Sequence, residues 1–303
     1  MRISLYIQRH YLLSQYIQRE YRHLFLPLYW HVLHDVPPAQ VISNRIIWSC
    51  VLLGLALLVA RQGRAFWRAI VAPRTLAVYA LAAVLISINW FIYVWAVNEG
   101  FVVEASLGYF INPLISVLLG VAFLHERLRR TQWVAVGIAA GGVVYLTWTY
   151  GSLPWIALTL AVSFALYGLL KKLAPLNSVQ GLALETGLLF LPALTYLLYV
   201  EQTTGGKFGH TSLATTLLLV GCGVVTTVPL VLFASASKRI PLLWLGLLQY
   251  IAPTLQFFLA INVFHEAMSA QRLIGFAAVW VALAIFSVEG LLAHRSSVSV
   301  TTD

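Results

Sequence analysis

The chain carries a series of apolar runs, each long enough to cross a lipid bilayer as a helix. A hydrocarbon core about 30 Å thick requires about 20 mostly apolar residues in helical form. Every backbone polar group must be satisfied inside such a core, which helices achieve within one segment. Nine membrane spans are predicted, at residues 41–60, 75–97, 101–124, 132–149, 152–170, 178–200, 212–236, 241–264 and 269–293.

Composition supports a membrane protein and excludes several other classes. Hydrophobic residues make up 60% of the 303 residues and charged residues only 10%, too few charges to coat a soluble particle of this size. The mean hydropathy of +0.85 also excludes a disordered or fibrous chain. The formal net charge of +9 could indicate nucleic-acid binding, so the position of the charges decides its meaning.

The basic residues alternate between successive loops. Twelve lie in the loops of one side, namely Arg61, Arg64, Arg68, Arg74, Arg127, Arg129, Arg130, Lys171, Lys172, Lys238, Arg239 and Arg295. The opposite loops hold only Lys207 and Arg272. This asymmetry is the positive-inside pattern, and it predicts that both termini are cytoplasmic. The net charge is therefore explained by topology, and we expect a lipid bilayer but no nucleic acid as a partner.

Shifting the chain against itself by 140 residues exposes an internal repeat. The matched positions are Leu107–Pro113 with Leu247–Pro253, His125-Glu126 with His265-Glu266, and Arg45 with Glu185. Each repeat unit contains five helices, an odd number, so the second copy enters the membrane from the opposite side. The predicted fold is an all-α polytopic membrane protein with a ten-helix 5+5 inverted repeat. Secondary transporters use this plan, with the substrate site near the membrane midplane.

The tenth helix required by the repeat is defective in sequence. Its segment, near residues 12–34, contains Arg19, Glu20 and Arg22, and each central charge costs at least about 2.5–3.5 kcal/mol on insertion. The first helix is therefore predicted to be degenerate. The expected divisions are an atypical segment 1–26, a first repeat 27–150, a second repeat 151–293 and a disordered cytoplasmic tail 294–303.

Two ionisable residues inside predicted spans are the leading candidates for function. Arg45 lies in the first half of its span, where it either snorkels to the lipid headgroups or serves as a cavity cation for a substrate or a carboxylate. Glu185 lies too deep for a short side chain to snorkel. It is therefore expected to be a proton site or the partner of a cation.

Further polar and aromatic residues line the third and fourth spans. Glu104 heads the fourth span, where a carboxylate either caps the helix or faces substrate. A stripe at near-helical spacing along the third span is either a cavity wall or polar packing between helices; it consists of Asn89, Trp90, Trp95 and Asn98.

Paired prolines mark equivalent places in the two repeats. Pro113 and Pro253 each free a carbonyl one turn back and bend a helix, which either lines a cavity or simply curves the helix. Four polar residues lie within a turn of these prolines and could use the opened backbone: Tyr109, Asn112, Gln249 and Tyr250.

Enzymatic and cofactor sites are not indicated. Neither a phosphate-binding loop, nor Gly-x-Ser-x-Gly, nor His-Glu-x-x-His occurs in the sequence. Cys50 and Cys222 fall inside predicted spans and are expected to pack as small apolar residues. No catalytic residue, metal ligand or cofactor is therefore predicted.

Several motifs resemble a known transporter family over residues 27–293. They are Asn89–Asn98, Glu104–Leu114, Pro27–Trp30, Asn44–Ser49, Gly151–Pro154, Val225–Leu230 and Gln249–Thr254. The sequence resembles the RarD-type proteins of the EamA family, within the drug/metabolite transporter superfamily. The resemblance implies a ten-helix carrier of the bacterial inner membrane, and the customary label of this family is chloramphenicol-sensitive protein. Relatives in the superfamily move amino acids, other metabolites or drugs, often by proton-coupled export. Upstream of Leu26 the chain departs from the family's apolar first helix.

These observations predict a secondary transporter, not an enzyme, that exports a small metabolite or drug-like solute by alternating access. Arg45 is expected to bind substrate or a counter-charge, and Glu185 and Glu104 are expected to be proton-linked. Its partners would be a small-molecule substrate and the lipid bilayer, with proton coupling and a homodimer left open. Two alternatives remain at this stage: a receptor or scaffold that does not transport, and an inactive product whose first helix fails to insert.

Overall fold

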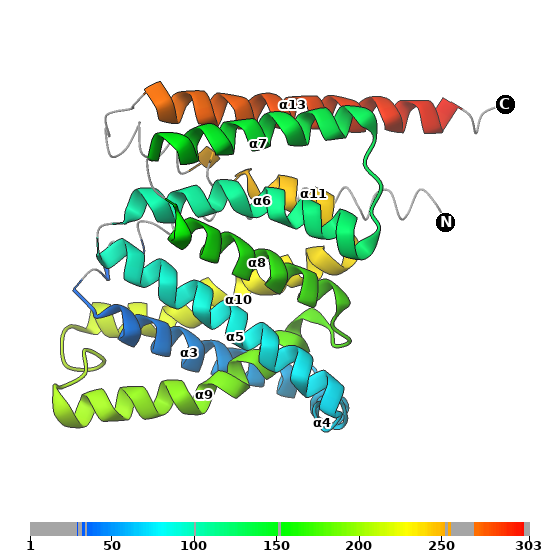
Figure 1. The fold of residues 1–303 in the computed structure, drawn as a ribbon. Coiled ribbons are helices and arrows are strands. Elements are labelled where there is room, and N and C mark those ends of the chain that lie inside the picture. The colour runs from blue at the N-terminus through cyan, green and yellow to red at the C-terminus, as the bar shows by residue number, and fades with distance from the viewer. Residues whose placement is uncertain are drawn as a thin grey trace. The chain divides into compact units, whose positions relative to one another are not determined.

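The structure is a computed structural model that describes residues 29, 32–33, 35–99, 101–150, 153–251, 254–255 and 270–299. All regular secondary structure among these residues is helical (Figure 1). The elements are α3 (Pro38–Val59), α4 (Gly63–Ile70), α5 (Pro73–Asn98), α6 (Val102–Leu124), α7 (Arg130–Tyr150), α8 (Trp155–Leu173), α9 (Ser178–Thr203), α10 (Leu213–Arg239), α11 (Leu242–Gln249) and α13 (Ala270–Ser299). The charged part of the predicted first helix and Pro253 lie outside the described residues.

Six of the described helices are long and apolar enough to cross a membrane: α3, α5, α6, α8, α9 and α10. The predicted all-helical polytopic fold is therefore confirmed for the described part of the chain. The predicted spans 132–149 and 269–293 correspond to α7 and α13. Of the predicted span 241–264, the structure describes α11 and five further residues, at positions 241, 250, 251, 254 and 255. The three predicted spans 132–149, 241–264 and 269–293 remain predictions as membrane crossings.

The positions of the helices support the internal repeat. In the first half, α3, α5, α6 and α7 begin at residues 38, 73, 102 and 130. In the second half, α9, α10, α11 and α13 begin at residues 178, 213, 242 and 270, each 140 residues later. The counterpart of α8 would begin near residue 15, outside the described residues, so the ten-helix count stays a prediction.

Short-range chemistry explains where several of these helices begin. Asn177 precedes α9, and its side chain accepts a hydrogen bond from the Gln180 amide at 2.9 Å. Ser212 does the same for α10 through the Thr215 amide at 3.0 Å. Each contact satisfies one of the amides that a helix start leaves without an internal partner. At α3, Pro38 occupies the first helical position, where its missing amide costs nothing.

The helix α4 was not predicted, because the first basic loop is too polar to form a span. Arg64 and Arg68 lie on this short helix. Its apolar residues Phe66 and Ile70 pack against a buried cluster that includes Tyr79 and Ala174, while Trp67 is exposed. A basic amphipathic helix with an exposed tryptophan is typical of a membrane interface.

The chain divides into two compact units that do not follow the halves of the sequence. Unit 1 consists of Met1–Trp95 and Leu166–Ile240, and unit 2 of Ala96–Ala165 and Pro241–Asp303. Helices α5 and α8 pass from one unit to the other. Each unit thus combines helices from both predicted repeats, whose sequence boundaries at 26, 150 and 293 remain predictions.

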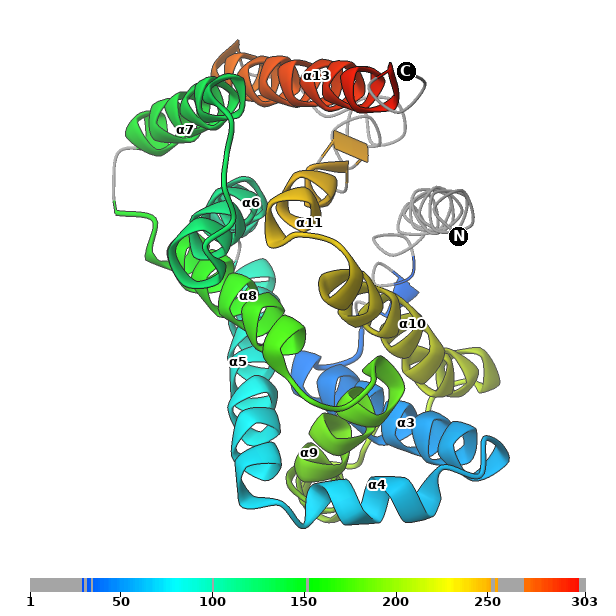
Figure 2. The ribbon, with the colours of Figure 1, turned by 90° about the vertical axis from the view of Figure 1, so that its right-hand side faces the viewer.

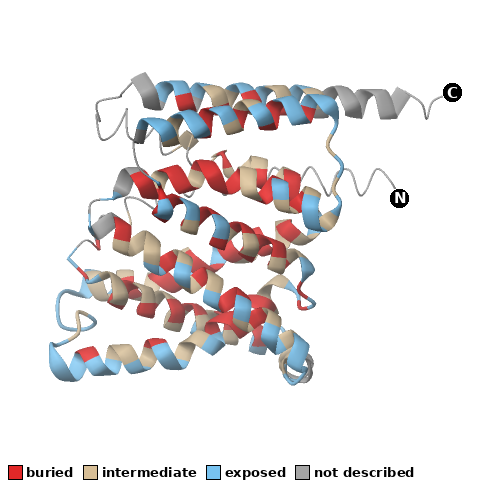
Figure 3. Ribbon diagram, viewed as in Figure 1, coloured by how far each residue is buried: buried red, intermediate tan, exposed pale blue. Residues whose placement is uncertain are grey.

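In unit 1, α3 packs against both α9 and α10 (Figure 2). Gly223 on α10 allows one of these contacts, because a Cβ placed there would lie 2.6 Å from the backbone carbon of Trp48. The Ser49 hydroxyl donates to the Gly223 carbonyl at 3.2 Å across the same contact. The buried residues of α9 gather near its start, from Gly181 to Thr186 (Figure 3). This end of α9 therefore lies in the core of unit 1.

In unit 2, helices at equivalent repeat positions pack in pairs. The helices α7 and α13 lie side by side along their length (Figures 1 and 2). The second pair, α6 and α11, is antiparallel, since Phe110 contacts Tyr250 and the later residue Pro113 contacts the earlier residue Gly246. Phe110 and Tyr250 are themselves 140 residues apart. Such self-pairing of equivalent residues is what a two-fold-related repeat predicts.

Candidate functional site

Unit 1 holds a partly exposed arginine between three apolar helices. Arg45 lies seven residues into α3, and its Nε donates to the Thr226 hydroxyl of α10 at 2.9 Å. Its guanidinium carbon lies 4.4 Å from the ring centroid of Trp90 on α5. A guanidinium over an indole face is a favourable cation–π contact. These contacts hold the head of Arg45 against neighbouring helices, and its role as a cavity cation stays a prediction.

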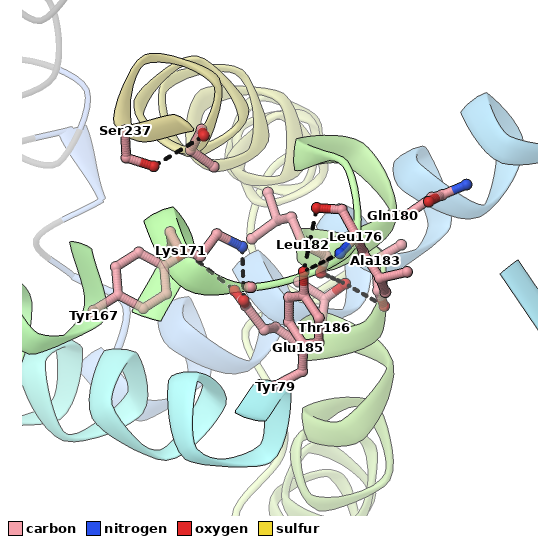
Figure 4. A network of polar contacts seen from close by, with 12 residues as sticks. Tyr79, Tyr167, Lys171, Leu176, Gln180, Leu182, Ala183, Glu185, Thr186 and Ser237 are labelled. Carbon is pink, nitrogen blue, oxygen red and sulfur yellow. Dashed lines mark hydrogen bonds and ion pairs between the residues drawn. The ribbon is translucent and has the colours of Figure 1, made fainter. Parts of the chain in front are cut away.

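Glu185 forms the centre of a second, fully buried cluster in unit 1 (Figure 4). Its Oε1 accepts from the Lys171 ammonium at 2.7 Å, and its Oε2 accepts from the Tyr167 hydroxyl at 3.0 Å. The side chains of Lys171 and Glu185 are 2% and 1% exposed. Glu185 is therefore buried and paired with a cation, Lys171 of α8, while its role as a proton site stays a prediction.

Lys171 was missed by sequence reasoning. The positive-inside count placed it in a cytoplasmic loop, but α8 continues to Leu173 and buries Lys171 in its last turn. A lysine directly after an apolar run is usually a topology signal, and nothing local distinguishes the two roles. Lys171 could have been found only from its partner, because a glutamate inside a span usually pairs with a cation from another helix.

Two tyrosine rings enclose the Lys171 ammonium. Its Nζ lies 5.4 Å from the ring centroid of Tyr167 and 5.5 Å from that of Tyr79. Tyr79 is held in place by the connection between α8 and α9, where its hydroxyl accepts from the Leu176 amide at 3.1 Å. Close packing on Gly181 also holds this ring, because a Cβ at Gly181 would lie 2.7 Å from Tyr79.

Two further lysines fasten the ends of α8 and α10 to each other. Lys172 donates to the Ile240 carbonyl at 2.6 Å and to the Ser237 carbonyl at 3.2 Å. Lys238 donates in return to the Ala174 carbonyl at 2.7 Å and to the Leu176 carbonyl. Each lysine thus binds carbonyls at the C-terminal end of the other helix, where the helix dipole favours a cation.

Unit 2 brings together three of the residues predicted around the prolines. The Asn112 amide donates to the Gln249 side-chain oxygen, and the Tyr250 hydroxyl donates to the Phe110 carbonyl at 3.1 Å. Pro113 lies inside α6, and its carbonyl faces Gly246 on α11. These contacts tie α6 to α11. Tyr109 lies partly buried on α6.

Glu104 is buried and contacts the start of another helix. Its Oε1 accepts from the Ile156 amide at 2.8 Å, at the beginning of α8. Glu126 behaves alike, accepting from the Leu242 and Leu243 amides at 2.7 and 2.9 Å at the start of α11. A carboxylate at a helix N-terminus is stabilised by the unpaired amides and the helix dipole. Glu104 thus contacts the start of α8, whereas the sequence predicted capping of its own helix, and its substrate-facing alternative stays a prediction.

Of the stripe predicted along α5, Trp90 takes part in the contacts around Arg45. Trp90 is buried and holds Arg45, while Asn89 and Trp95 are partly buried. Asn98 is the last residue of α5.

Among the described residues, no group of three His, Cys, Asp or Glu side chains could hold a metal ion, and both cysteines are free thiols.

The chain is similar to known membrane transporters. The EamA-like transporter family matches residues 25–148. Protein RarD of Streptomyces exfoliatus is 47% identical over 90% of this chain and 86% of its own. The uncharacterized transporter YojE of Bacillus subtilis (strain 168) is 46% identical over 90% of this chain and 92% of its own. A solved crystal structure has a TM-score of 0.65 at 21% identity, covering 89% of this chain and 95% of that one, which shows likeness of fold.

Proposed function

The chain belongs to the EamA-like transporter family as a RarD-type member, and on this premise we propose that it exports a small solute by alternating access, driven by protons. It is a multi-pass membrane transporter of the inner membrane, since its RarD relatives are bacterial and six described helices can cross a bilayer. Transporters of this kind need no covalent chemistry.

The observation that carries the proposal is the placement of Arg45 in unit 1. Arg45 belongs to the apolar helix α3 and is partly exposed. The Trp90 ring lies against its guanidinium, and the Thr226 hydroxyl accepts a hydrogen bond from its Nε. A fixed guanidinium in a site of low polarity can bind a carboxylate or phosphate group in two-pronged geometry. We therefore expect a solute, either a metabolite or a drug-like compound, that carries an anionic or strongly electronegative group.

A proton-linked carboxylate would complete the site. Glu185 is the candidate that we favour, because it is fully buried and lies on the membrane helix α9, at the repeat position that matches Arg45. Glu104 is the second candidate, although its contact with the start of α8 already accounts for its burial. Both termini are proposed to be cytoplasmic, in line with the loop charges.

Flux through purified protein tests the proposal. The full chain would be reconstituted in lipid vesicles, and uptake of labelled chloramphenicol and of a labelled amino-acid mixture would be measured with and without a pH gradient. We expect uptake above that of empty vesicles, increased by the gradient. A receptor or scaffold that does not transport, or an inactive product, would give uptake equal to empty vesicles for every probe.

A variant of the favoured carboxylate tests the coupling ion. Glu185→Gln is expected to abolish the increase caused by the pH gradient. An unchanged increase would exclude Glu185 as the proton site and leave Glu104 to be examined in the same way.

A further inference from the structure

The cluster around Glu185 contains more than one acid and one base. Its carboxylate uses both oxygens, one toward the Lys171 ammonium and the other toward the Tyr167 hydroxyl. The ammonium also lies against the faces of Tyr79 and Tyr167 (Figure 4). Lys171 is thus held by two kinds of contact, of which only one depends on the charge of Glu185.

Neutralising the Glu185 carboxylate removes only one of the two kinds of contact that hold Lys171. A buried ion pair that loses one charge normally leaves the other uncompensated, which strongly destabilises the fold. Here the two tyrosine rings would still face the ammonium after a proton had neutralised Glu185. The face of an aromatic ring attracts a cation, and most strongly where water is excluded. The cluster can therefore accept a proton without expelling its lysine.

We propose that Lys171 is the positioning residue of the coupling site, holding Glu185 ionised until a proton arrives, and that Tyr79 and Tyr167 then retain its ammonium. This inference rests on the proposed proton-coupled transport. In the step itself, a proton from water binds a carboxylate oxygen of Glu185, and the net charge of the pair changes from zero to plus one. Release of that proton to water on the other side restores the pair.

The surroundings of the pair are consistent with this assignment. From α8 it is faced by Tyr167 and from α5 by Tyr79. The ammonium of Lys238 on α10 acts electrostatically on Lys171. From α3, the Cys50 thiol contacts Thr186, the residue after Glu185. Of these neighbouring groups, Lys171 alone forms an ion pair with Glu185, so it exerts the strongest control over the charge of the carboxylate.

An infrared titration of the full chain in lipid vesicles would test the proposal without a known solute. A band from a protonated carboxyl group should appear reversibly on acidification and be missing in Glu185→Gln. In Lys171→Gln the loss of the ammonium favours the protonated acid, so the band should appear at a pH higher by about one unit or more. Lys171→Arg keeps the charge and should behave like the unaltered chain.

A second variant covers the case in which Lys171→Gln does not fold. Tyr167→Phe keeps the ring over the ammonium but removes the hydroxyl that donates to Glu185. It should fold and should also move the band to higher pH, because a hydrogen bond to the ionised form is lost. A purely structural ion pair gives a different result, either no Glu185-dependent band at any pH at which the protein is folded, or a band that neither variant moves. Either result overturns the proposal.

The transport assay separates this inference from the proposed function. If the vesicles show no flux of chloramphenicol or amino acids while the titration behaves as expected, the transport proposal fails and the assignment of Lys171 as the residue controlling the charge of Glu185 stands. If flux depends on a pH gradient but the titration fails, the role of Lys171 is wrong.

Discussion

The two units of the molecule use charged side chains in different ways. In unit 1, Arg45 and Glu185 lie inside apolar helices, and Lys171, in the last turn of α8, pairs with Glu185. In unit 2, the carboxylates of Glu104 and Glu126 bind backbone amides at helix starts. The cost of burying a charge at a helix end is offset by its hydrogen bonds to unpaired backbone groups and by the helix dipole. A charge inside an apolar helix gains no such hydrogen bonds from a helix end, so the burial of Arg45 and Glu185 is what function must explain.

Within unit 1, one repeat position carries opposite charges. Arg45 and Glu185 each lie seven residues after the start of their helices, α3 and α9. Arg45 is partly exposed beside a hydroxyl and an indole, whereas Glu185 is buried beside an ammonium and a phenol. Under the proposed function, the first of these positions would bind a solute and the second would hold an internal charge pair.

The largest expected effect comes from breaking the ion pair of unit 1. Lys171→Met leaves the Glu185 carboxylate buried without its cation, which should reduce the stability of the folded protein by about 3–5 kcal/mol. The double variant Lys171→Met with Glu185→Gln removes both charges and should regain most of that loss. Thermal unfolding monitored by size-exclusion fluorescence would measure both. A single variant as stable as the unaltered chain would contradict the assignment of a buried pair.

Changes at Arg45 should affect transport more than stability. Arg45→Gln removes charge-assisted hydrogen bonds worth about 1.5–3 kcal/mol, so the apparent affinity for a carboxylate-bearing probe should fall about tenfold to a hundredfold. The concentration dependence of labelled amino-acid uptake measures this effect, with Trp90→Phe as a milder control that keeps an aromatic face. Equal affinity in the Arg45 variant would mean that the guanidinium serves the lipid headgroups instead.

Much of the fold could be predicted from the sequence because its signals are periodic and local. Apolar runs predicted the positions of eight described helices, six of them long and apolar enough to cross a membrane, and the repeat offset of 140 matches the starts of four helix pairs. The chemistry of Asn177 and Ser212 as helix caps is also local. Fold therefore follows from the length, polarity and spacing of segments.

The partners within the candidate site could not be predicted in the same way. Lys171 and Glu185 are 14 residues apart, and Arg45 and Thr226 are 181 apart. Hydropathy says that a residue is inside the membrane but not which helix faces it. The helix α4 was missed for a related reason, since its apolar residues gain their partners only from Tyr79 and Ala174 on other segments.

A glycine in each unit offers a comparison of packing without charge. Gly223→Ala would place a Cβ 2.6 Å from the Trp48 backbone, and Gly246→Ala would place one 2.8 Å from the Pro113 carbonyl. Because backbone cannot yield easily, each should cost about 1–3 kcal/mol by overpacking. Gly137→Ala meets no atom within 4 Å and should be neutral or slightly stabilising. Thermal unfolding of the three variants would compare the helix contacts of the two units.

The smallest expected effect concerns the carboxylates of unit 2. Glu104→Gln keeps an oxygen that can accept from the Ile156 amide but loses the charge that favours the start of α8. The cost should be about 0.3–1 kcal/mol, seen as a small decrease in unfolding temperature, with no change in uptake driven by a pH gradient. Glu126→Gln at the start of α11 is the matched control and should behave alike. If Glu104→Gln instead folded normally and lost the response to the gradient, the coupling carboxylate would belong to unit 2. The contrast between the units would then be reversed, because the buried pair of Lys171 and Glu185 would serve the fold and a helix-end carboxylate would serve transport.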